Sequence, residues 1–275
     1  MMVAPAYFAA LSQNMTAKPE QTALITGASA GIGYELAKLF ARDGYRLVLV
    51  ARRKVAMEKH AEELRKLGSP GVTVIVKDLS LLEAPDQLFA ETQKAKIHVD
   101  VLVNNAGFGG NGAFAKTNLD DELDMMQLNM VALTHLTKLY LPAMLARKRG
   151  QIVNIASTAA FQPGPLMAVY YATKAYVLSF TEAIYEELRG TGVTATCVCP
   201  GATHTEFAKR ARMEHSKLFQ ARAMNADRVA AKAYKGIQQG KPLVIPGFMN
   251  WLGTQLVRIG PRSTVRKAVR KIQEN

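Results

Sequence analysis

The chain has 275 residues, 49% hydrophobic and 21% charged, a composition typical of globular proteins that excludes a disordered or fibrous one. Lysine and arginine, 35 in all, outnumber 22 acidic residues, and the formal charge of +13 favours anionic partners. No run approaches the roughly 20 apolar residues that span a bilayer, and the opening residues lack the pattern of a secretory signal, so a cytoplasmic location is expected.

Short apolar runs rich in β-branched residues alternate with longer helical patterns through most of the chain. They predict strands at 22–26, 46–51, 72–77, 100–104, 151–156, 193–199 and 242–245. Apolar strands joined by helices form parallel sheets that are buried on both faces. We therefore expect one doubly wound, Rossmann-like α/β domain of about seven strands over residues 19–247. Residues 1–18 would be a flexible extension, and 248–275 a basic helical tail.

The first predicted strand runs directly into a glycine-rich turn and a helix, in the segment ITGASAGIGYEL at 25–36. Glycine lets a backbone turn tightly and approach a ligand, and the N-terminus of a helix presents unpaired N–H groups to an anion. This position after the first strand predicts a phosphate-binding turn.

Four motifs in chain order carry a resemblance to a known family. They are the T-G-x-x-x-G-x-G spacing of this turn, the NNAG segment at 104–107, the pair Tyr170-x-x-x-Lys174, and Pro200-Gly201. Over residues 20–245 the chain resembles the short-chain dehydrogenase/reductases. This resemblance implies a single-domain oxidoreductase that moves a hydride between a nicotinamide cofactor and a carbonyl or hydroxyl group.

The end of the second strand bears on the choice of cofactor. Folds that select NAD usually carry an acid there, but this chain has Ala51 followed by Arg52. A guanidinium can hold a 2′-phosphate with two hydrogen bonds, so NADP(H) is the expected cofactor. Arg53 and Lys54 can instead begin the next helix in solvent. With the contacts that the resemblance implies, the expected cofactor-binding residues are Gly27, Ser29, Ile32, Gly33, Arg52, Asp78, Leu79, Asn104, Ala106, Gly107, Tyr170, Lys174, Pro200, Gly201 and Thr205.

A predicted helix at 168–180 carries three tyrosines and one lysine. Carbonyl reduction needs a neutral acid that can give up its proton, and a nearby ammonium lowers a phenol's pKa. Positions i and i+4 share a helix face, so Lys174 selects Tyr170, whereas Tyr171 and Tyr176 are expected to pack or to contact substrate. The resemblance adds Ser157 as the residue that binds the substrate oxygen and Asn129 as the fourth catalytic residue. In the family this asparagine disturbs its helix and holds a water that links the lysine to solvent.

The remaining segments bear on substrate and partners. Residues 203–226 stand where the family has its substrate lid, and their mixture of apolar and basic residues favours a hydrophobic ketone, 3-oxoacyl or steroid-like substrate, although an amphipathic helix packed on the sheet also fits. The tail has an apolar stripe and many bases. Such a helix can contact a membrane peripherally, or it can pack on its own domain or on a second subunit. The resemblance implies a homodimer or a homotetramer.

Other classes have less support. An NADP-binding regulator or scaffold with little turnover is the main alternative, although the complete catalytic set disfavours it. An epimerase or dehydratase would usually need a longer C-terminal domain. Cys197 and Cys199 lie in one apolar strand, and no histidine shows metal-ligand spacing, so no metal is expected. No nucleic-acid-binding motif accompanies the positive charge, so nucleic acid is not an expected partner.

Overall fold

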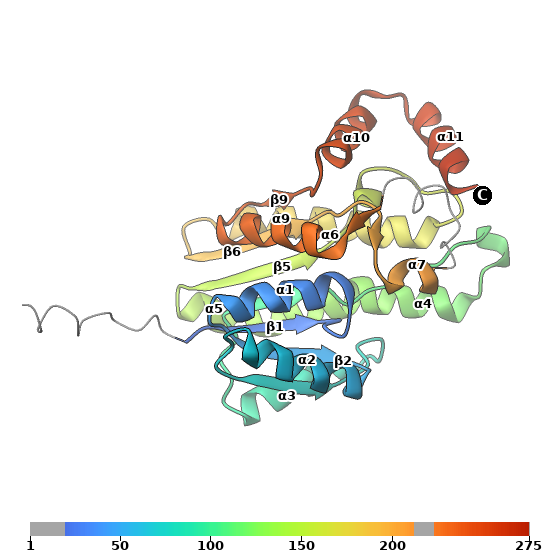
Figure 1. Ribbon diagram of the computed structural model, residues 1–275. Helices are drawn as coiled ribbons and strands as arrows, with labels where there is room; N and C mark the ends of the chain where they lie inside the picture. The colour runs from blue at the N-terminus through green and yellow to red at the C-terminus, as the bar shows by residue number, and fades with distance from the viewer. Residues whose placement is uncertain (1–19, 212–222, 275) are drawn as a thin grey trace, which may run out of the picture.

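A computed structural model describes residues 20–211 and 223–274 of the chain. A seven-stranded sheet forms its centre (Figure 1), and every neighbouring pair of strands is parallel. In spatial order the strands are β3 (Val72–Val76), β2 (Arg46–Ala51), β1 (Thr22–Thr26), β4 (Val101–Asn104), β5 (Gly150–Ile155), β6 (Val193–Val198) and β9 (Leu243–Val244). The doubly wound parallel sheet predicted from the sequence is confirmed.

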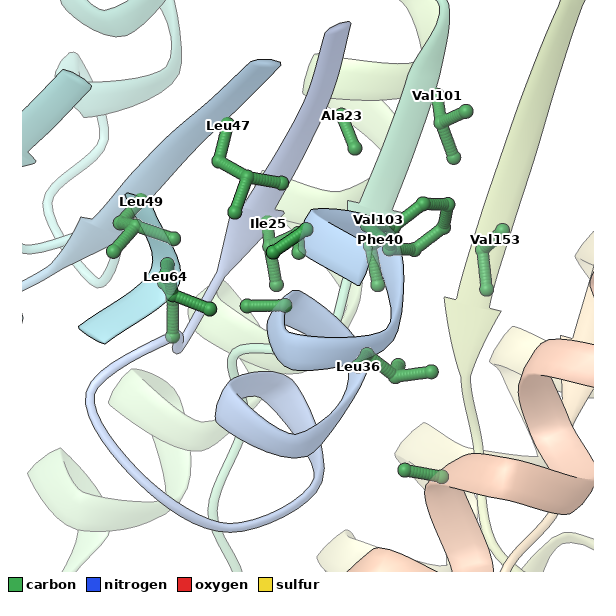
Figure 2. Packing of buried hydrophobic residues seen from close by; sticks show 14 of the residues in the cluster. Ala23, Ile25, Leu36, Phe40, Leu47, Leu49, Leu64, Val101, Val103 and Val153 are labelled. Carbon is green, nitrogen blue, oxygen red and sulfur yellow. The ribbon is translucent and has the colours of Figure 1, made fainter. Parts of the chain in front are cut away.

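Alternation along the strands explains why helices cover both faces of the sheet. Ala23 and Ile25 of β1 pack in one apolar cluster, whereas Leu24 between them packs in another on the opposite face. Figure 2 shows the first cluster, where Leu36 and Phe40 of a helix meet the side chains of four strands. The helices on this face are α1 (Gly31–Arg42), α2 (Lys54–Lys66) and α9 (Ala226–Gln238), and those on the other face are α3 (Ala84–Lys94), α5 (Leu133–Ala146) and α6 (Ala168–Glu187).

The strand order reverses between β1 and β4, which are neighbours in the sheet although β2 and β3 separate them in sequence. Open parallel sheets bind ligands beyond the carboxyl ends of their strands at this switch point. The glycine turn follows β1 and the NNAG segment follows β4. Two predicted motifs therefore meet at one edge of the sheet because of the winding of the chain.

The helix that leads from α4 (Leu119–Met126) into α5 contains a wider turn at Gln127–Ala132, with π-helical hydrogen bonding. Asn129 lies in this turn and is buried. Turns of this kind often occur at functional sites because the extra residue redirects a side chain. The local disturbance expected around this asparagine is present.

Further elements follow β6. They are β7 (Thr203–His204), α7 (Glu206–Arg210), β8 (Met224–Asn225), α10 (Phe248–Ile259) and α11 (Arg262–Gln273). The predicted extension at 1–18 lies outside the described residues, as does part of the predicted lid, 212–222. Among the described residues, no helix combines the length and the apolar character needed to cross a bilayer.

Candidate active site

A cavity of about 730 Å³ opens at the carboxyl edge of the sheet. It runs from the glycine turn to α6, and α7 and α11 also contribute to its walls. Most of the predicted site residues line it, namely Gly27, Ser29, Ile32, Arg52, Asp78, Leu79, Ala106, Gly107, Ser157, Tyr170, Lys174, Pro200, Gly201 and Thr205. Gly33, Asn104 and Asn129 do not line it.

The glycine turn has the geometry of an anion cradle. Gly27 and Gly31 have φ angles of +65° and +58°, which L side chains rarely adopt. A Cβ on Gly27 would lie 2.9 Å from the Cα of Ala106. No side chain caps the N-terminus of α1 and no acid occupies its first turn, so its N–H groups are available to a negative group. These features fit the pyrophosphate of a dinucleotide.

Gly33 and Asn104 have structural roles in this cradle. A Cβ on Gly33 would lie 2.4 Å from the Asn105 side chain, so this glycine permits α1 to pack closely. Asn104 points into the sheet, where its Nδ2 donates to the Asn154 and Thr137 side chains. Its neighbour Asn105, which the sequence interpretation missed, lines the cavity and donates from Nδ2 to the Thr26 carbonyl, which joins the two motifs.

Two arginines stand beside the cradle after β2. Arg52 is half exposed, and its Nη1 lies 3.3 Å from Asp78 Oδ2. Burial alone would raise the pKa of Asp78, but hydrogen bonds from Ser80 and Arg52 outweigh it and lower this pKa. Arg53 donates from Nη2 to Ser29 Oγ at 3.1 Å in the glycine turn and pairs with Glu206 of α7 at 2.7 Å. The sequence favoured Arg52 alone, whereas both guanidinium groups line the cavity.

Ser157, Tyr170 and Lys174 come together at the deep end of the cavity. Ser157 follows β5, and the other two residues lie one turn apart on α6. Lys174 is buried; its Nζ donates to the Ile155 carbonyl at 2.9 Å and lies 5.8 Å from the centre of the Tyr170 ring. The strand end and the helix therefore place a hydroxyl, a phenol and an amine around one point.

The pKa values in this group differ from the sequence expectation. Lys174 was expected to lower the pKa of Tyr170, but burial raises that pKa well above its ordinary value, and the hydrogen bond with Ser157 opposes the rise. Burial also lowers the pKa of Lys174 to about 8, because the apolar surroundings disfavour its charged form. Desolvation is therefore the largest influence on the pKa of both groups.

Asn129 lies behind the cavity wall and holds two elements in place. Its Oδ1 accepts from the Phe108 N–H at 3.1 Å, and its Nδ2 donates to the Phe108 carbonyl at 2.9 Å and to Thr173 Oγ1 at 3.1 Å. It thus fixes the loop after β4 against α6. A Cβ on Gly107 would lie 2.9 Å from Asn129 Oδ1 and 3.5 Å from Lys174 Nζ, so this glycine brings the loop close to both side chains.

Two phenylalanines, Phe108 and Phe207, lie in the cavity wall near Tyr170. Phe207 of α7 packs on the Tyr170 ring at 5.3 Å between ring centres. The guanidinium carbon Cζ of Arg210, also on α7, lies 3.7 Å from the centre of the Phe108 ring. These contacts arise within the predicted lid region and give the cavity an apolar wall next to Tyr170.

The C-terminal helix also contributes to this wall, and its contact with the cavity was not predicted from the sequence. Val269 of α11 is buried in the cluster that contains Tyr170 and Tyr171. Gln273 lines the cavity, and its Nε2 donates to the hydroxyl of Tyr171 at 2.7 Å. Val265 and Val269 of the predicted apolar stripe therefore pack against their own domain, one of the alternatives left open by the sequence, whereas Ile272 of the stripe is exposed. The i, i+4 spacing of the two valines was the signal for a packed face.

Neither cysteine belongs to a disulfide or to a candidate metal site. Cys197 and Cys199 are buried free thiols with their sulfurs 3.7 Å apart. In the described part of the chain, no group of three or more histidine, cysteine, aspartate or glutamate residues is arranged to hold a metal ion.

Comparison with known proteins agrees with this geometry. The family model described as short chain dehydrogenase matches residues 21–216. A putative ketoacyl reductase of Streptomyces coelicolor is 37% identical over 79% of this chain and 84% of its own length. A short-chain dehydrogenase from Sphingobium yanoikuyae, solved in complex with NADPH, is 33% identical over 90% of this chain and 97% of that one, with a TM-score of 0.78.

A second solved structure differs in its cofactor. This short-chain dehydrogenase/reductase from Burkholderia phymatum, in complex with NAD, is 25% identical over 86% of this chain and 92% of that one, with a TM-score of 0.79. Fold and motifs together define a nicotinamide-dependent oxidoreductase. The chain belongs to the short-chain dehydrogenase/reductase family.

Proposed function

We propose that the chain is an NADPH-preferring carbonyl reductase, or in reverse an alcohol dehydrogenase, for a hydrophobic ketone, 3-oxoacyl or steroid-like substrate. The observation that carries this proposal is one cavity with an anion cradle and two arginines at one end and Ser157, Tyr170 and Lys174 at the other. The apolar wall supports a hydrophobic substrate. The Streptomyces coelicolor relative is named a putative ketoacyl reductase, which is consistent with carbonyl reduction.

Each residue has a distinct part in the proposed reaction. NADPH supplies the hydride when it is bound. Ser157 Oγ donates a hydrogen bond to the substrate oxygen and orients the carbonyl, and Tyr170 Oη transfers its proton to that oxygen. Lys174 holds the nicotinamide ribose and stabilises the phenolate that remains. Asn129 holds the loop that follows β4 against α6, so that the catalytic groups stay aligned.

The cofactor preference is proposed from Ala51, Arg52 and Arg53. No acid stands at the end of β2 to bind the ribose hydroxyl or to repel a 2′-phosphate, and each arginine can form charge-assisted hydrogen bonds with that phosphate. NADH lacks this phosphate. A preference for NADPH follows if either guanidinium turns toward it.

Fluorescence titration of NADPH and NADH tests this assignment. Arg52→Ala and Arg53→Ala should each weaken NADPH binding about tenfold or more and leave NADH binding nearly unchanged, since a hydrogen bond to a charged group contributes roughly 1.5–3 kcal/mol. Lys54→Ala is the matched control, because Lys54 is exposed and pairs with Glu58 on its own helix. An equal loss of affinity for both nucleotides would contradict recognition of the 2′-phosphate. Turnover is tested separately by a screen of ketones with NADPH.

We also propose that the chain forms a homodimer or homotetramer through α4 and the turn that follows it. Leu119, Leu123, Met126 and Val131 are large apolar residues exposed on this stretch. Exposed apolar residues at helical spacing are typical of a subunit interface. Light scattering of the wild type and of Leu123→Glu tests this, and an unchanged mass would contradict an interface here.

A further inference from the structure

The helix α10 exposes its apolar side and buries its polar side, the reverse of an ordinary amphipathic helix on the surface of a globular protein. Phe248, Met249, Leu256 and Ile259 are 54% to 81% exposed, and Trp251 is 45% exposed. At about 100° per residue these five side chains fall within one half of the helix surface. The helix therefore places most of its large apolar side chains in solvent.

Polar side chains attach α10 to the rest of the molecule. Thr254 is only 2% exposed, and Asn250 donates from Nδ2 to the sulfur of Met224 in β8 at 3.7 Å. A Cβ on Gly201 would lie within 2.6 Å of three Asn250 atoms, so the polar side of the helix packs tightly on the loop after β6. The apolar face therefore cannot turn inward without breaking these contacts.

The adjoining helix α11 adds positive charge beside α10. Its inward residues pack on the domain, whereas its basic residues are all exposed. The exposed basic residues of the two helices are Arg258 on α10 and Arg262, Arg266, Lys267, Arg270 and Lys271 on α11. The one acid in this segment, Glu274, pairs with Arg270 at 2.6 Å. Figure 1 shows α10 and α11 as a hairpin at the edge of the molecule, outside the layers of helices that cover the sheet.

We propose that this hairpin is a docking surface for an anionic lipid bilayer, with the apolar face of α10 entering the headgroup region and the bases of α11 meeting lipid phosphates. Apolar side chains flanked by lysine and arginine are the pattern of helices that lie in a membrane interface, and tryptophan favours that region. A second copy is a poorer occupant, because a symmetric contact would bring two sets of like charges together.

Vesicle co-sedimentation of the full chain tests the proposal. The protein should pellet with vesicles of phosphatidylcholine and phosphatidylglycerol in equal amounts, and much less with phosphatidylcholine alone. Ile259→Ser should reduce partitioning about tenfold, because it removes an apolar side chain that enters the headgroup region. The triple variant Arg266→Glu, Lys267→Glu and Lys271→Glu should reduce it on the order of a hundredfold.

Matched variants separate this surface from general effects of charge and hydrophobicity. Val55→Ser is the apolar control, because Val55 on α2 is 81% exposed, the same fraction as Ile259. Lys66→Glu, Lys94→Glu and Lys138→Glu, combined in one variant, control for the reversal of three charges elsewhere on the surface. Both controls should pellet like the wild type, and every variant should keep NADPH binding, since none of these residues lines the cavity.

Two outcomes would overturn the proposal. One is a wild type that stays in the supernatant with anionic vesicles, and the other is equal loss of binding in the hairpin variants and in their controls. If vesicle binding is absent and Ile259→Ser lowers the mass found by light scattering, the apolar face of α10 contacts a second copy instead.

Discussion

The two ends of the cavity are built in different ways. At the cofactor end, short segments that directly follow β1, β2 and β4 converge because the sheet is wound, and glycines permit the backbone angles and close approaches of the turn. At the substrate end, side chains from α6, α7 and α11 pack on one another, and Gln273 meets a tyrosine 102 residues earlier in the chain. Thus backbone geometry forms the first end, and side-chain packing forms the second.

The largest expected effect concerns the chemistry where the two ends meet. Tyr170→Phe should lower kcat by roughly 10²- to 10⁴-fold, the contribution typical of a positioned general acid, with a much smaller effect on NADPH affinity. Steady-state kinetics with a ketone found in the screen measures it. Tyr176→Phe is the control, because that tyrosine bonds Thr134 outside the cavity and should retain full activity. Equal activities of the two variants would exclude Tyr170 as the acid.

A backbone change should damage the cofactor end alone. Gly27→Ala puts a methyl group 2.9 Å from the Cα of Ala106 at a φ of +65°, so the NADPH dissociation constant should rise about tenfold or more. Gly44→Ala separates strain from collision, because its φ is +78° but nothing lies within 4 Å of the added Cβ. It should lower stability by about 1 kcal/mol without changing affinity. If both variants bind NADPH equally well, the close approach at Gly27 is unimportant.

The buried amine should make stability depend on pH. Unfolded, Lys174 keeps its proton up to its ordinary pKa of 10.5, whereas the folded chain releases it near 8, so unfolding takes up a proton between these values. From about pH 7.5 to about pH 9.5 the wild type should gain about 2 kcal/mol of unfolding free energy relative to Lys174→Met, since each pKa unit corresponds to roughly 1.4 kcal/mol. Urea unfolding at both values measures this difference. A difference that is independent of pH would mean that the amine is hydrated.

The smallest expected effect is a change in KM that shows whether α11 contributes to substrate binding. Gln273→Leu removes the hydrogen bond to Tyr171 at nearly constant volume, and KM for the ketone should rise about fivefold, as expected for a loss of about 1 kcal/mol. Affinity for NADPH should not change. Ile272→Ala on the same helix is the control, because Ile272 faces solvent. If the control raises KM equally, α11 acts only through general stability.

The same contrast explains how far the sequence predicts this protein. The strands, the glycine turn and the pair Tyr170 and Lys174 follow from local period and spacing, and the sheet and the family likeness are confirmed. The orientation of Asn104 could not be predicted, because a motif cannot tell which of two adjacent asparagines points into the sheet. The position of α11 was left open, because an apolar stripe does not specify what covers it. Desolvation raises the pKa of Tyr170 and depends on packing from several elements, so spacing alone could not predict its effect.

The contact of α11 with Tyr171 has a consequence for biosynthesis. All strands of the sheet precede this helix in the chain, so the ribosome completes the cofactor end before it makes the last part of the substrate wall. A nascent chain can therefore adopt a dinucleotide-binding shape while the substrate side still lacks its final wall. Nucleotide binding during translation would stabilise the sheet before the enzyme can select a substrate.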